Sequence, residues 1–392
     1  MTIRVLVEQP SLAKYRLPVF QELARRPGLD FTLCYSQAPT LPNVEPDGFN
    51  ARFVPSWRGT VAGRRIIWNG SCWANARRGA ADVLILNWNL NHLNLVPALL
   101  RARANGVGTI LWGHGYSKAE ARWRRLGRHG AARLANALLF YNFSTARQFM
   151  EQGWPKERIY VALNALDQRP IQAARRAWMA EPGRLGAFRK EQGIGEGPVL
   201  LYVSRIKPEN RLDLLIRATA LLRKRHPLLQ TVVVGTGAEL DELKTLAARE
   251  GAGEAVRFLG AVYDEMALAP WFLSADAFCY PANIGLSLLH AFGYGLPVIT
   301  TDRNELQNPE IEALEPGRNG LVYKHDDLEA LASTLERVIV DRPLRESLAA
   351  EALVTATQRF NLRTMVDGIE QAIRYAAAAV RSDEVVAANP GE

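Results

Sequence analysis

Three cations follow closely after an apolar run in the second half of the chain. Arg205, Lys207 and Arg211 lie within seven residues of one another, and Ser204 precedes them at the end of the predicted strand 199–204. Guanidinium and ammonium groups in this position can clamp a diphosphate and stabilise the negative charge of a leaving group. A solvated, charged surface loop is the alternative interpretation of the segment.

A glycine turn between a strand and a helix forms a second candidate site. The run 275–302 predicts a strand that ends at Tyr280-Pro281, a short loop, and a helix from Leu286 to Tyr294. Such a turn presents backbone N–H groups at a helix N-terminus, where they bind phosphate groups. An ordinary strand–turn–helix connection without a ligand is the alternative. The candidate contacts are Ile284, Gly285, Leu286 and Ser287.

Gly235 and Gly237 form a further strand-then-glycine pattern after the apolar run 230–234. The pattern lacks the third glycine of a dinucleotide-binding fingerprint. The two glycines either let the backbone approach a ligand or make the turn itself.

These segments need a framework of parallel strands. Continuous apolar runs alternate with helical stretches, which is typical of parallel sheets covered by helices on both faces. Each half of the chain has enough strands for one doubly wound α/β sheet of the Rossmann type. The predicted strands are 3–7, 31–35, 51–54, 82–86, 109–112, 138–141 and 159–162 in the first half, and 199–204, 230–234, 256–259, 277–280, 298–300 and 321–323 in the second.

The pattern divides the 392 residues into two Rossmann-like domains, 1–180 and 181–360. A C-terminal helix at 361–380 follows and can cross back to the N-terminal domain, and residues 381–392 lack an apolar face and are expected to fray. No apolar run reaches the ~18 residues that a membrane helix needs, and no signal peptide is visible. The three cysteines show no metal-binding or disulfide spacing, which suits a reducing cytoplasm.

Positive charge is concentrated in the first half. Residues 1–180 hold 25 lysines and arginines against 10 acidic residues, whereas the remainder holds 23 against 30. No nucleic-acid motif accompanies these arginines, so no nucleic-acid partner is expected.

The stretch from Lys118 to Ala137 predicts a basic amphipathic helix. Its apolar face carries Trp123, and its arginines suit an anionic membrane surface. The alternative is a helix that packs its apolar stripe on the sheet. The predicted membrane contacts are Trp123, Arg124, Arg125 and Arg128.

His114 lies between two glycines directly after the apolar run 109–112. This spacing exposes it at the carboxyl end of a strand, where it can orient an acceptor or stabilise a departing phosphate. His92 is a second candidate. For both residues, a packed loop histidine is the alternative.

Taken in order, the segments 203–213, 232–237 and 275–302 resemble the C-terminal domain of family-4 retaining glycosyltransferases, over roughly residues 198–360. The segment Asn164-Ala165-Leu166-Asp167 resembles the family's Asn-Gly-Val-Asp. The resemblance implies the GT-B fold, with two Rossmann-like domains facing across a cleft. It implies transfer of a sugar from a nucleotide sugar with retained anomeric configuration. It also implies no metal and no other cofactor, and the chain contains no Asp-x-Asp pair.

The resemblance further implies where each substrate binds. The nucleotide sugar belongs to the C-terminal domain, with Arg205 stabilising the leaving diphosphate. The acceptor, lipid-linked or an oligosaccharide, belongs near Tyr15, Arg16 and His114, although Tyr15 and Arg16 can equally begin a surface helix. Together with the basic helix, this predicts an enzyme of polysaccharide or glycolipid assembly, cytoplasmic and peripheral at the inner face of the membrane.

The chain departs from the family pattern at three positions. The two glutamates that the family separates by seven residues correspond to Ala282 and His290, and the family's lysine corresponds to Asn210. Arg211 or Lys207 can substitute for that lysine. A branch of the superfamily has histidine at the second position and a later Pro-Glu, here Pro309-Glu310. His290 is therefore expected to contact the ribose and Glu310 to lie in the donor crevice; a structural histidine and a solvated loop glutamate are the alternatives.

Two other functions remain open at this point. A sugar-nucleotide epimerase shares the fold, but it uses carboxylates near the anomeric carbon, and Ala282 argues against one there. A catalytically degenerate GT-B protein that binds a saccharide or an anion is suggested by Ala282 and Asn210 together.

Overall fold

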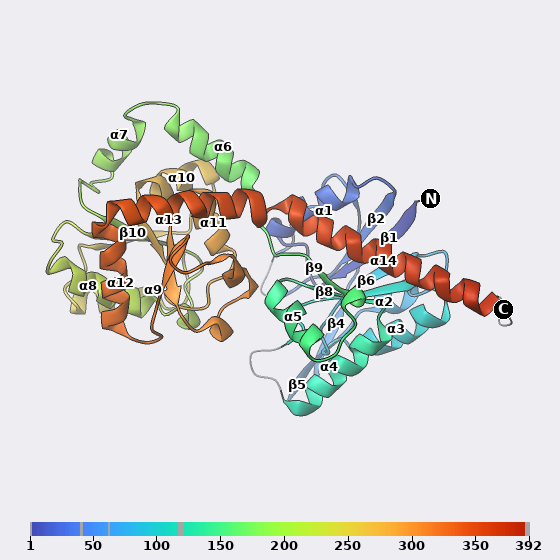
Figure 1. Ribbon diagram of the computed structural model, residues 1–392. Coiled ribbons are helices and arrows are strands. Elements are labelled where there is room, and N and C mark those ends of the chain that lie inside the picture. Colours follow the sequence, from blue (N-terminus) through green and yellow to red (C-terminus); the bar gives the residue numbers. More distant parts are fainter. Residues whose placement is uncertain (1, 40–41, 62, 117–120, 389–392) are drawn as a thin grey trace. The chain divides into compact units, whose positions relative to one another are not determined.

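The computed structural model describes residues 2–39, 42–61, 63–116 and 121–388, and these form two compact units (Figure 1). The first unit contains the chain up to Asn164 and again from Leu362, and the second contains Ala165–Asn361. Each unit is built on a parallel sheet with packed helices. The predicted fold of two doubly wound α/β domains is therefore confirmed.

The first unit has a seven-stranded parallel sheet in the order β3-β2-β1-β6-β7-β8-β9. The strand order reverses between β1 and β6. Its strands are β1 (Ile3–Gln9), β2 (Leu29–Tyr35), β3 (Asn50–Phe53), β6 (Val83–Asn87), β7 (Gly108–Trp112), β8 (Ala137–Phe140) and β9 (Ile159–Val161). Its helices are η1 (Lys14–Arg16), α1 (Leu17–Ala24), α2 (Gly70–Asn75), α3 (Leu95–Ala104), α4 (Arg122–Leu134), α5 (Phe143–Glu151), η2 (Lys156–Arg158) and α14 (Leu362–Ala388).

The C-terminal helix α14 packs on this first sheet. It contacts β7, β8 and β9 and lies alongside α1 (Figure 1). Gly368 permits the close approach, because a Cβ at this position would lie 1.9 Å from the carbonyl oxygen of Val161. Helices α2 to α5 contribute to a separate buried cluster with strand residues such as Leu84, Leu86 and Phe140.

The first unit also contains a hairpin that the sequence pattern did not reveal. Strands β4 (Trp57–Val61) and β5 (Arg64–Trp68) pair antiparallel, with Trp57 opposite Trp68. Trp57 and Trp68 are both exposed. Because neither face of the hairpin is fully buried, its strands lack the continuous apolar run that marks the others.

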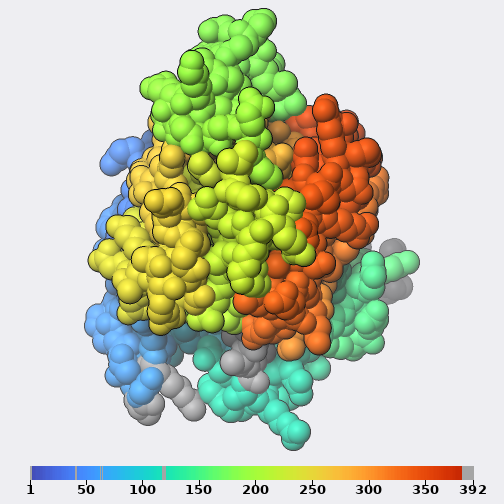
Figure 2. All heavy atoms as spheres, turned by 90° about the vertical axis from the view of Figure 1, so that its left-hand side faces the viewer, coloured from blue at the N-terminus to red at the C-terminus, as the bar shows by residue number. Residues whose placement is uncertain are grey.

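The second unit has a six-stranded parallel sheet in the order β12-β11-β10-β13-β14-β15, and its order reverses between β10 and β13. Helix α8 contacts both α9 and α12, which flank it on the face shown in Figure 2. The strands are β10 (Val199–Val203), β11 (Gln230–Val234), β12 (Val256–Gly260), β13 (Ala277–Cys279), β14 (Val298–Thr301) and β15 (Gly320–Tyr323). The helices are α6 (Gln168–Met179), α7 (Arg184–Glu191), η3 (Pro208–Asn210), α8 (Leu212–Arg223), α9 (Leu240–Arg249), α10 (Glu265–Ser274), α11 (Ser287–Gly293), η4 (Asn304–Leu306), η5 (Pro309–Ala313), α12 (Leu328–Val340), α13 (Arg342–Val354) and the π-helical turn η6 (Thr355–Arg359).

The boundary between the units lies at 164/165, earlier than the predicted 180/181. Helix α6 belongs to the second unit because its side chains bond to that unit's helices. Gln172 donates to the carbonyl oxygen of Gly293 at 2.6 Å, and the Trp178 indole donates to that of Met266 at 2.8 Å. The second unit therefore begins with a docked helix.

The expected fraying after residue 380 is also corrected. Helix α14 continues to Ala388, because the sequence offers no helix breaker before Pro390. Residues 389–392 lie outside the described residues. Along the described part of the chain, no helix is both long and apolar enough to cross a bilayer.

Candidate functional site

The carboxyl ends of β10 and β13 meet where the strand order of the second sheet reverses. In open α/β sheets, ligands bind in the crevice outside the carboxyl ends of the strands at such a point. Ser204 and Arg205 follow β10, and Tyr280 follows β13. The Tyr280 hydroxyl donates to Ser204 Oγ at 3.2 Å, so the structure brings these two loops together. Arg205 is exposed at this edge.

Asn210 holds the Arg205 loop in place. Its side-chain amide donates to the carbonyl oxygen of Arg205 at 2.7 Å and to the Tyr202 hydroxyl at 2.8 Å. Its backbone oxygen accepts from the backbone N–H of Ala282 at 3.3 Å. Asn210 is only 2% exposed. Asn210, which stands where the family has its donor-binding lysine, therefore fixes the position of the Arg205 loop.

The two other cations of this segment are paired with carboxylates. Arg211 has a left-handed backbone (φ 55°) and forms ion pairs with Asp213, at 3.0 Å, and with Asp326. Lys207 lies 3.4 Å from Glu209. These contacts argue against Arg211 as a replacement for the missing lysine, because a bound diphosphate would have to compete with two carboxylates.

Gly235 and Gly237 let the loop after β11 pack against the Arg205 loop. A Cβ at Gly235 would lie 1.8 Å from the carbonyl oxygen of Ser204, and one at Gly237 would lie 1.9 Å from that of Ile206. The two loops are also hydrogen-bonded: the backbone N–H of Ser204 donates to the carbonyl oxygen of Val234 at 3.0 Å, and that of Ile206 donates to the carbonyl oxygen of Thr236 at 2.9 Å. The glycines are thus required by a close approach of two loops.

Two side chains clamp the loop that precedes α11. The backbone N–H of Ile284 donates to Gln307 Oε1 at 2.7 Å, and Asn308 Nδ2 donates to the carbonyl oxygens of Asn283 (3.0 Å) and Ile284 (3.1 Å). Glu310 follows directly in η5 and is 5% exposed, so it is not a solvated loop residue.

The first turn of α11 begins after this clamped loop. The turn leaves backbone N–H groups without intrahelical partners, and no side chain among the described residues caps them. Ser287 opens the helix, one residue later than predicted. Anion binding by the backbone N–H groups of Gly285, Leu286 and Ser287 stays a prediction. The clamped loop before α11 supports it, because the loop holds these groups in place.

His290 is bonded to a glutamate that the sequence pattern did not single out. Its Nε2 lies 2.8 Å from Glu265 Oε1, and the Tyr294 hydroxyl donates to the same oxygen at 2.5 Å. The imidazole packs 4.6 Å from the ring of Phe272. Glu265 begins α10, twenty-five residues upstream, and no local motif indicates the pairing. A carboxylate thus stands beside the position where the family has its second glutamate.

In the first unit, Tyr15, Arg16 and His114 gather at the carboxyl edge of the sheet. Tyr15 and Arg16 belong to η1, and Arg16 directly precedes α1, so the two residues do begin a helical segment; Arg16 is nevertheless buried, at 8% exposed. Its guanidinium and the His114 ring both face Tyr141, at 5.1 Å and 4.9 Å from the ring centre. His114 is exposed, as its flanking glycines predicted.

The predicted membrane contacts on α4 divide into two groups. Trp123 and Leu126 are 51% and 72% exposed, whereas Ala131, Ala132 and Leu134 further along α4 pack against the core of the unit. Arg125 is exposed and Arg124 half-buried, whereas Arg128 is buried and donates to the carbonyl oxygen of Trp88. Arg128 is therefore a packing residue, contrary to the prediction. Lys118 lies outside the described residues.

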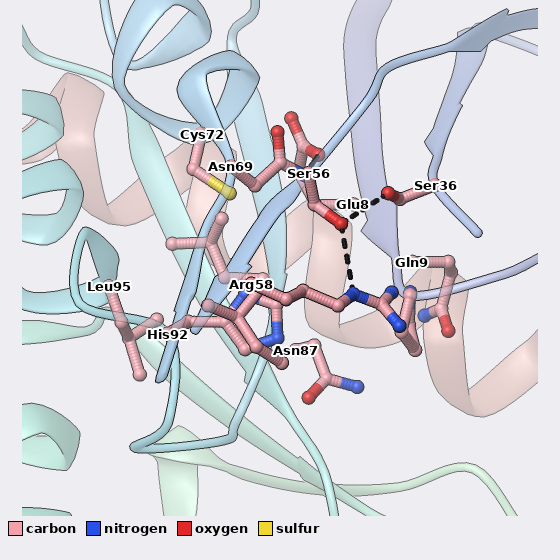
Figure 3. A pocket seen from close by; sticks show the side chains of 13 residues that line it. Glu8, Gln9, Ser36, Ser56, Arg58, Asn69, Cys72, Asn87, His92 and Leu95 are labelled. Atoms are coloured by element: carbon pink, nitrogen blue, oxygen red, sulfur yellow. Dashed lines mark hydrogen bonds between the residues drawn. The ribbon is translucent and has the colours of Figure 1, made fainter. Parts of the chain in front are cut away.

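A polar pocket at the carboxyl edge of the first sheet was not predicted beyond His92. It lies where the order of that sheet reverses, between β1 and β6. Figure 3 shows Arg58 bonded to Ser56 (3.3 Å), which bonds in turn to Ser36 (2.7 Å). The lining residues are Glu8, Gln9, Pro10, Ser36, Ser56, Arg58, Ile67, Asn69, Cys72, Leu86, Asn87, His92 and Leu95.

Burial shifts the pKa values of two groups of this pocket in opposite directions. It raises the pKa of Glu8 to about 7, although Ser71, Asn75 and Asn69 donate hydrogen bonds to the carboxylate. Burial, aided by Arg58, lowers the pKa of His92 to about 4. Both side chains are therefore held neutral over part of the range in which they would be charged in water.

The two shifts predict opposing effects of pH on stability. Between pH 4.5 and 7 the unfolded chain releases the Glu8 proton and the folded chain keeps it, so stability falls as pH rises. Between pH 4 and 6.5 the unfolded chain binds a proton at His92 and the folded chain does not, so stability rises with pH. Each effect amounts to about 3 kcal/mol over its window. In the wild type they largely cancel.

Urea unfolding of Glu8→Gln and His92→Gln across this pH range tests the prediction. The free energy of unfolding of Glu8→Gln minus that of the wild type is expected to rise with pH. The same difference for His92→Gln is expected to fall with pH. Profiles parallel to wild type in both variants would show that neither group titrates as described.

The two Rossmann-like units define the GT-B class of fold. Residues 186–353, within the second unit, match the family described as "Glycosyl transferases group 1". HepE from Anabaena, solved in complex with UDP, superposes with a TM-score of 0.69 at 17% identity, over 95% of this chain and 100% of HepE.

Two curated proteins are similar in sequence. One is the GDP-mannose-dependent alpha-(1-6)-phosphatidylinositol monomannoside mannosyltransferase of Mycolicibacterium smegmatis, 26% identical over 63% of this chain and 64% of the relative. The other is the D-inositol 3-phosphate glycosyltransferase of Jonesia denitrificans, 32% identical over 42% and 40%. The chain thus spans less than two thirds of the length of either relative.

Proposed function

We propose that this protein is a retaining glycosyltransferase that moves a sugar from a nucleotide sugar to a lipid-linked or saccharide acceptor. The observation that carries the proposal is the sheet edge where the carboxyl ends of β10 and β13 meet, with Arg205 exposed beside a clamped loop. The match of this unit to group 1 glycosyltransferases and the UDP complex of HepE support it. The donor nucleotide binds between the Arg205 loop and the first turn of α11.

His290 and Glu265 supply the ribose contact in this proposal. Glu265 holds His290 Nε2 and so orients the ring. Ala282 is buried and offers no side-chain hydrogen bond, so another group binds the donor hexose. Neither a metal nor another cofactor takes part, and the developing charge on the diphosphate is met by Arg205 and backbone N–H groups.

Turnover of a panel of nucleotide sugars tests the proposal. The full-length protein is expected to transfer or slowly hydrolyse at least one UDP-, GDP- or ADP-sugar, equally well with and without EDTA. Binding of a nucleoside diphosphate without turnover of any donor would favour the degenerate binding protein instead. Interconversion of the free donor into an epimer would favour the epimerase.

We further propose that the first unit docks on an anionic membrane surface at the inner face, through a surface that we call the Trp–Arg surface. Arg124 donates to Asn91 Oδ1 at 3.0 Å, and Asn91 accepts a backbone bond from Ile67 of the hairpin. These bonds join α4 to β5. The Trp–Arg surface comprises Trp57, Arg65, Trp68, Leu93, Arg122, Trp123, Arg125 and Leu126, all exposed.

Substituting serine for both Trp123 and Leu126 is expected to weaken binding to vesicles rich in phosphatidylglycerol at least about tenfold. Each apolar side chain contributes roughly 1.5–3 kcal/mol when fully buried. Co-sedimentation measures the effect, and Leu228→Ser serves as the control because Leu228 is 67% exposed in the second unit. Equal sedimentation of all three proteins would exclude this surface from membrane docking.

A further inference from the structure

Arg16 is a buried cation surrounded by aromatic rings. Its guanidinium carbon lies 5.3 Å from the ring centre of Tyr15 and 5.1 Å from those of Trp112 and Tyr141. Arg16 ends η1 after the loop that follows β1, Trp112 ends β7, and Tyr141 follows β8. The side chain thus lies at the carboxyl edge of the first sheet, the edge at which open α/β sheets bind ligands.

Within the described part of the chain, Arg16 has no carboxylate partner. The guanidinium cannot lose its proton, and a charge removed from water is costly unless it is paired. Arg16 Nη1 donates to Met365 Sδ at 3.8 Å, and a thioether is a weak acceptor.

A neighbouring arginine shows what a structural ion pair looks like in this unit. Arg26 lies 2.7 Å from Asp367 and 3.3 Å from Glu370, both on α14. The same helix presents Met365 to Arg16. Helix α14 therefore supplies carboxylates to Arg26, whereas Arg16 faces aromatic rings. These rings attract a cation but compensate its buried charge only in part.

Two further hydrogen-bonding groups belong to the same aromatic cluster as Arg16. Trp112 is 1% exposed, and its indole N–H has no hydrogen-bond partner among the described residues. The His114 ring lies 4.9 Å from Tyr141, the ring that Arg16 also faces. A buried donor without a partner destabilises the folded state, and a ligand oxygen that accepts from it would remove this cost.

We infer that Arg16, Trp112 and His114 form a binding site for a phosphate group carried by the acceptor. Arginine binds phosphate through two parallel N–H···O bonds, and an anion here would supply the missing counter-charge. His114 lies on the exposed side of the cluster. The inference rests on the proposed transferase function, and it narrows the acceptor from any saccharide or lipid to one that bears a phosphate monoester or diester.

Calorimetric titration of the full-length protein tests the site. Saturating UDP is added first, so that phosphate binding at the donor site does not contribute. Glycerol 1-phosphate represents a phosphate monoester, a short-chain phosphatidylglycerol represents a lipid diester, and glycerol is the neutral control. We expect at least one of the two phosphate ligands to bind and glycerol not to bind. The ligand that binds more tightly shows whether the acceptor carries a phosphate monoester or a lipid phosphodiester.

Arg16→Gln is expected to weaken phosphate binding at least tenfold and to leave UDP binding unchanged. Arg25→Gln, which removes an exposed arginine of the same unit, is expected to bind as wild type does. Arg16→Lys keeps the charge but not the two-pronged geometry, so its phosphate binding is expected to be weakened severalfold. This variant also replaces Arg16→Gln in the test if Arg16→Gln does not fold. Unchanged phosphate binding in the Arg16 variants, or no phosphate binding by the wild type, would overturn the inference.

The same titrations separate this inference from the transferase proposal. If the protein bound no nucleoside diphosphate but still bound phosphate through Arg16, the transferase proposal would be contradicted and the phosphate site would stand. If the protein bound nucleotides normally but bound no phosphate ligand, only the inferred phosphate site would be contradicted.

Discussion

Replacing Arg205 by alanine is expected to lower kcat/KM for sugar transfer by about 10²–10³-fold. Arg205 is exposed at the carboxyl edge of the second sheet, and its backbone is fixed there by Asn210 and by the loop after β11. A cation preorganised beside a leaving diphosphate acts mainly on charge that develops in the transition state. Steady-state kinetics with the best donor of the panel measure the effect, which should fall mostly on kcat.

Two variants make the Arg205 result specific. Lys224→Ala removes an exposed cation at the end of α8 and should retain wild-type kinetics. Arg205→Lys should recover part of the activity, because it restores a charge without the planar fork. Wild-type kcat/KM in Arg205→Ala would remove Arg205 from the catalytic account.

Gly235→Ala is expected to lower the free energy of unfolding of the second unit by about 3 kcal/mol or more. The residue has a φ of 150°, and the new Cβ would lie 1.8 Å from the backbone oxygen of Ser204. The Arg205 loop would have to move to relieve the clash. Weakened binding of nucleoside diphosphates should therefore accompany the loss of stability, measured by urea unfolding and thermal shift on the same protein.

Gly253→Ala is the matched control. Its Cβ would meet its nearest neighbour, Ala248 Cα, at 3.5 Å, an ordinary van der Waals distance. It should unfold and bind nucleotides as the wild type does. If Gly235→Ala were as stable as Gly253→Ala, the close approach of the two loops would be wrong.

Most of the framework can be predicted because buried parallel strands appear in the sequence as apolar runs. The run 230–234 coincides with β11, and each of the other predicted strands overlaps an observed one. The hairpin β4–β5 escapes this reasoning because its strands are only partly buried and carry arginines and a glycine. The boundary was predicted too late because α6 docks by hydrogen bonds such as that from Gln172 to Gly293, which no composition shift reveals.

The candidate site is predictable only where its residues adjoin strand ends. Arg205, Gly285 and His114 follow apolar runs, so their places at sheet edges follow from the chain order. The burial of Arg16 and Arg128 depends on partners far along the chain, Met365 for Arg16 and Trp88 for Arg128. The bond between His290 and Glu265 likewise joins α11 to α10, and no spacing rule predicts it.

A crystal structure of the full-length protein with a bound nucleoside diphosphate tests the central claim most directly. UDP, GDP and ADP would be tried in turn. The two phosphates are expected to lie within hydrogen-bonding distance of the Arg205 guanidinium and of the backbone N–H groups of Gly285 to Ser287. A diphosphate bound elsewhere, with the edge between β10 and β13 filled by the protein's own side chains, would contradict the assignment of this edge as the donor site.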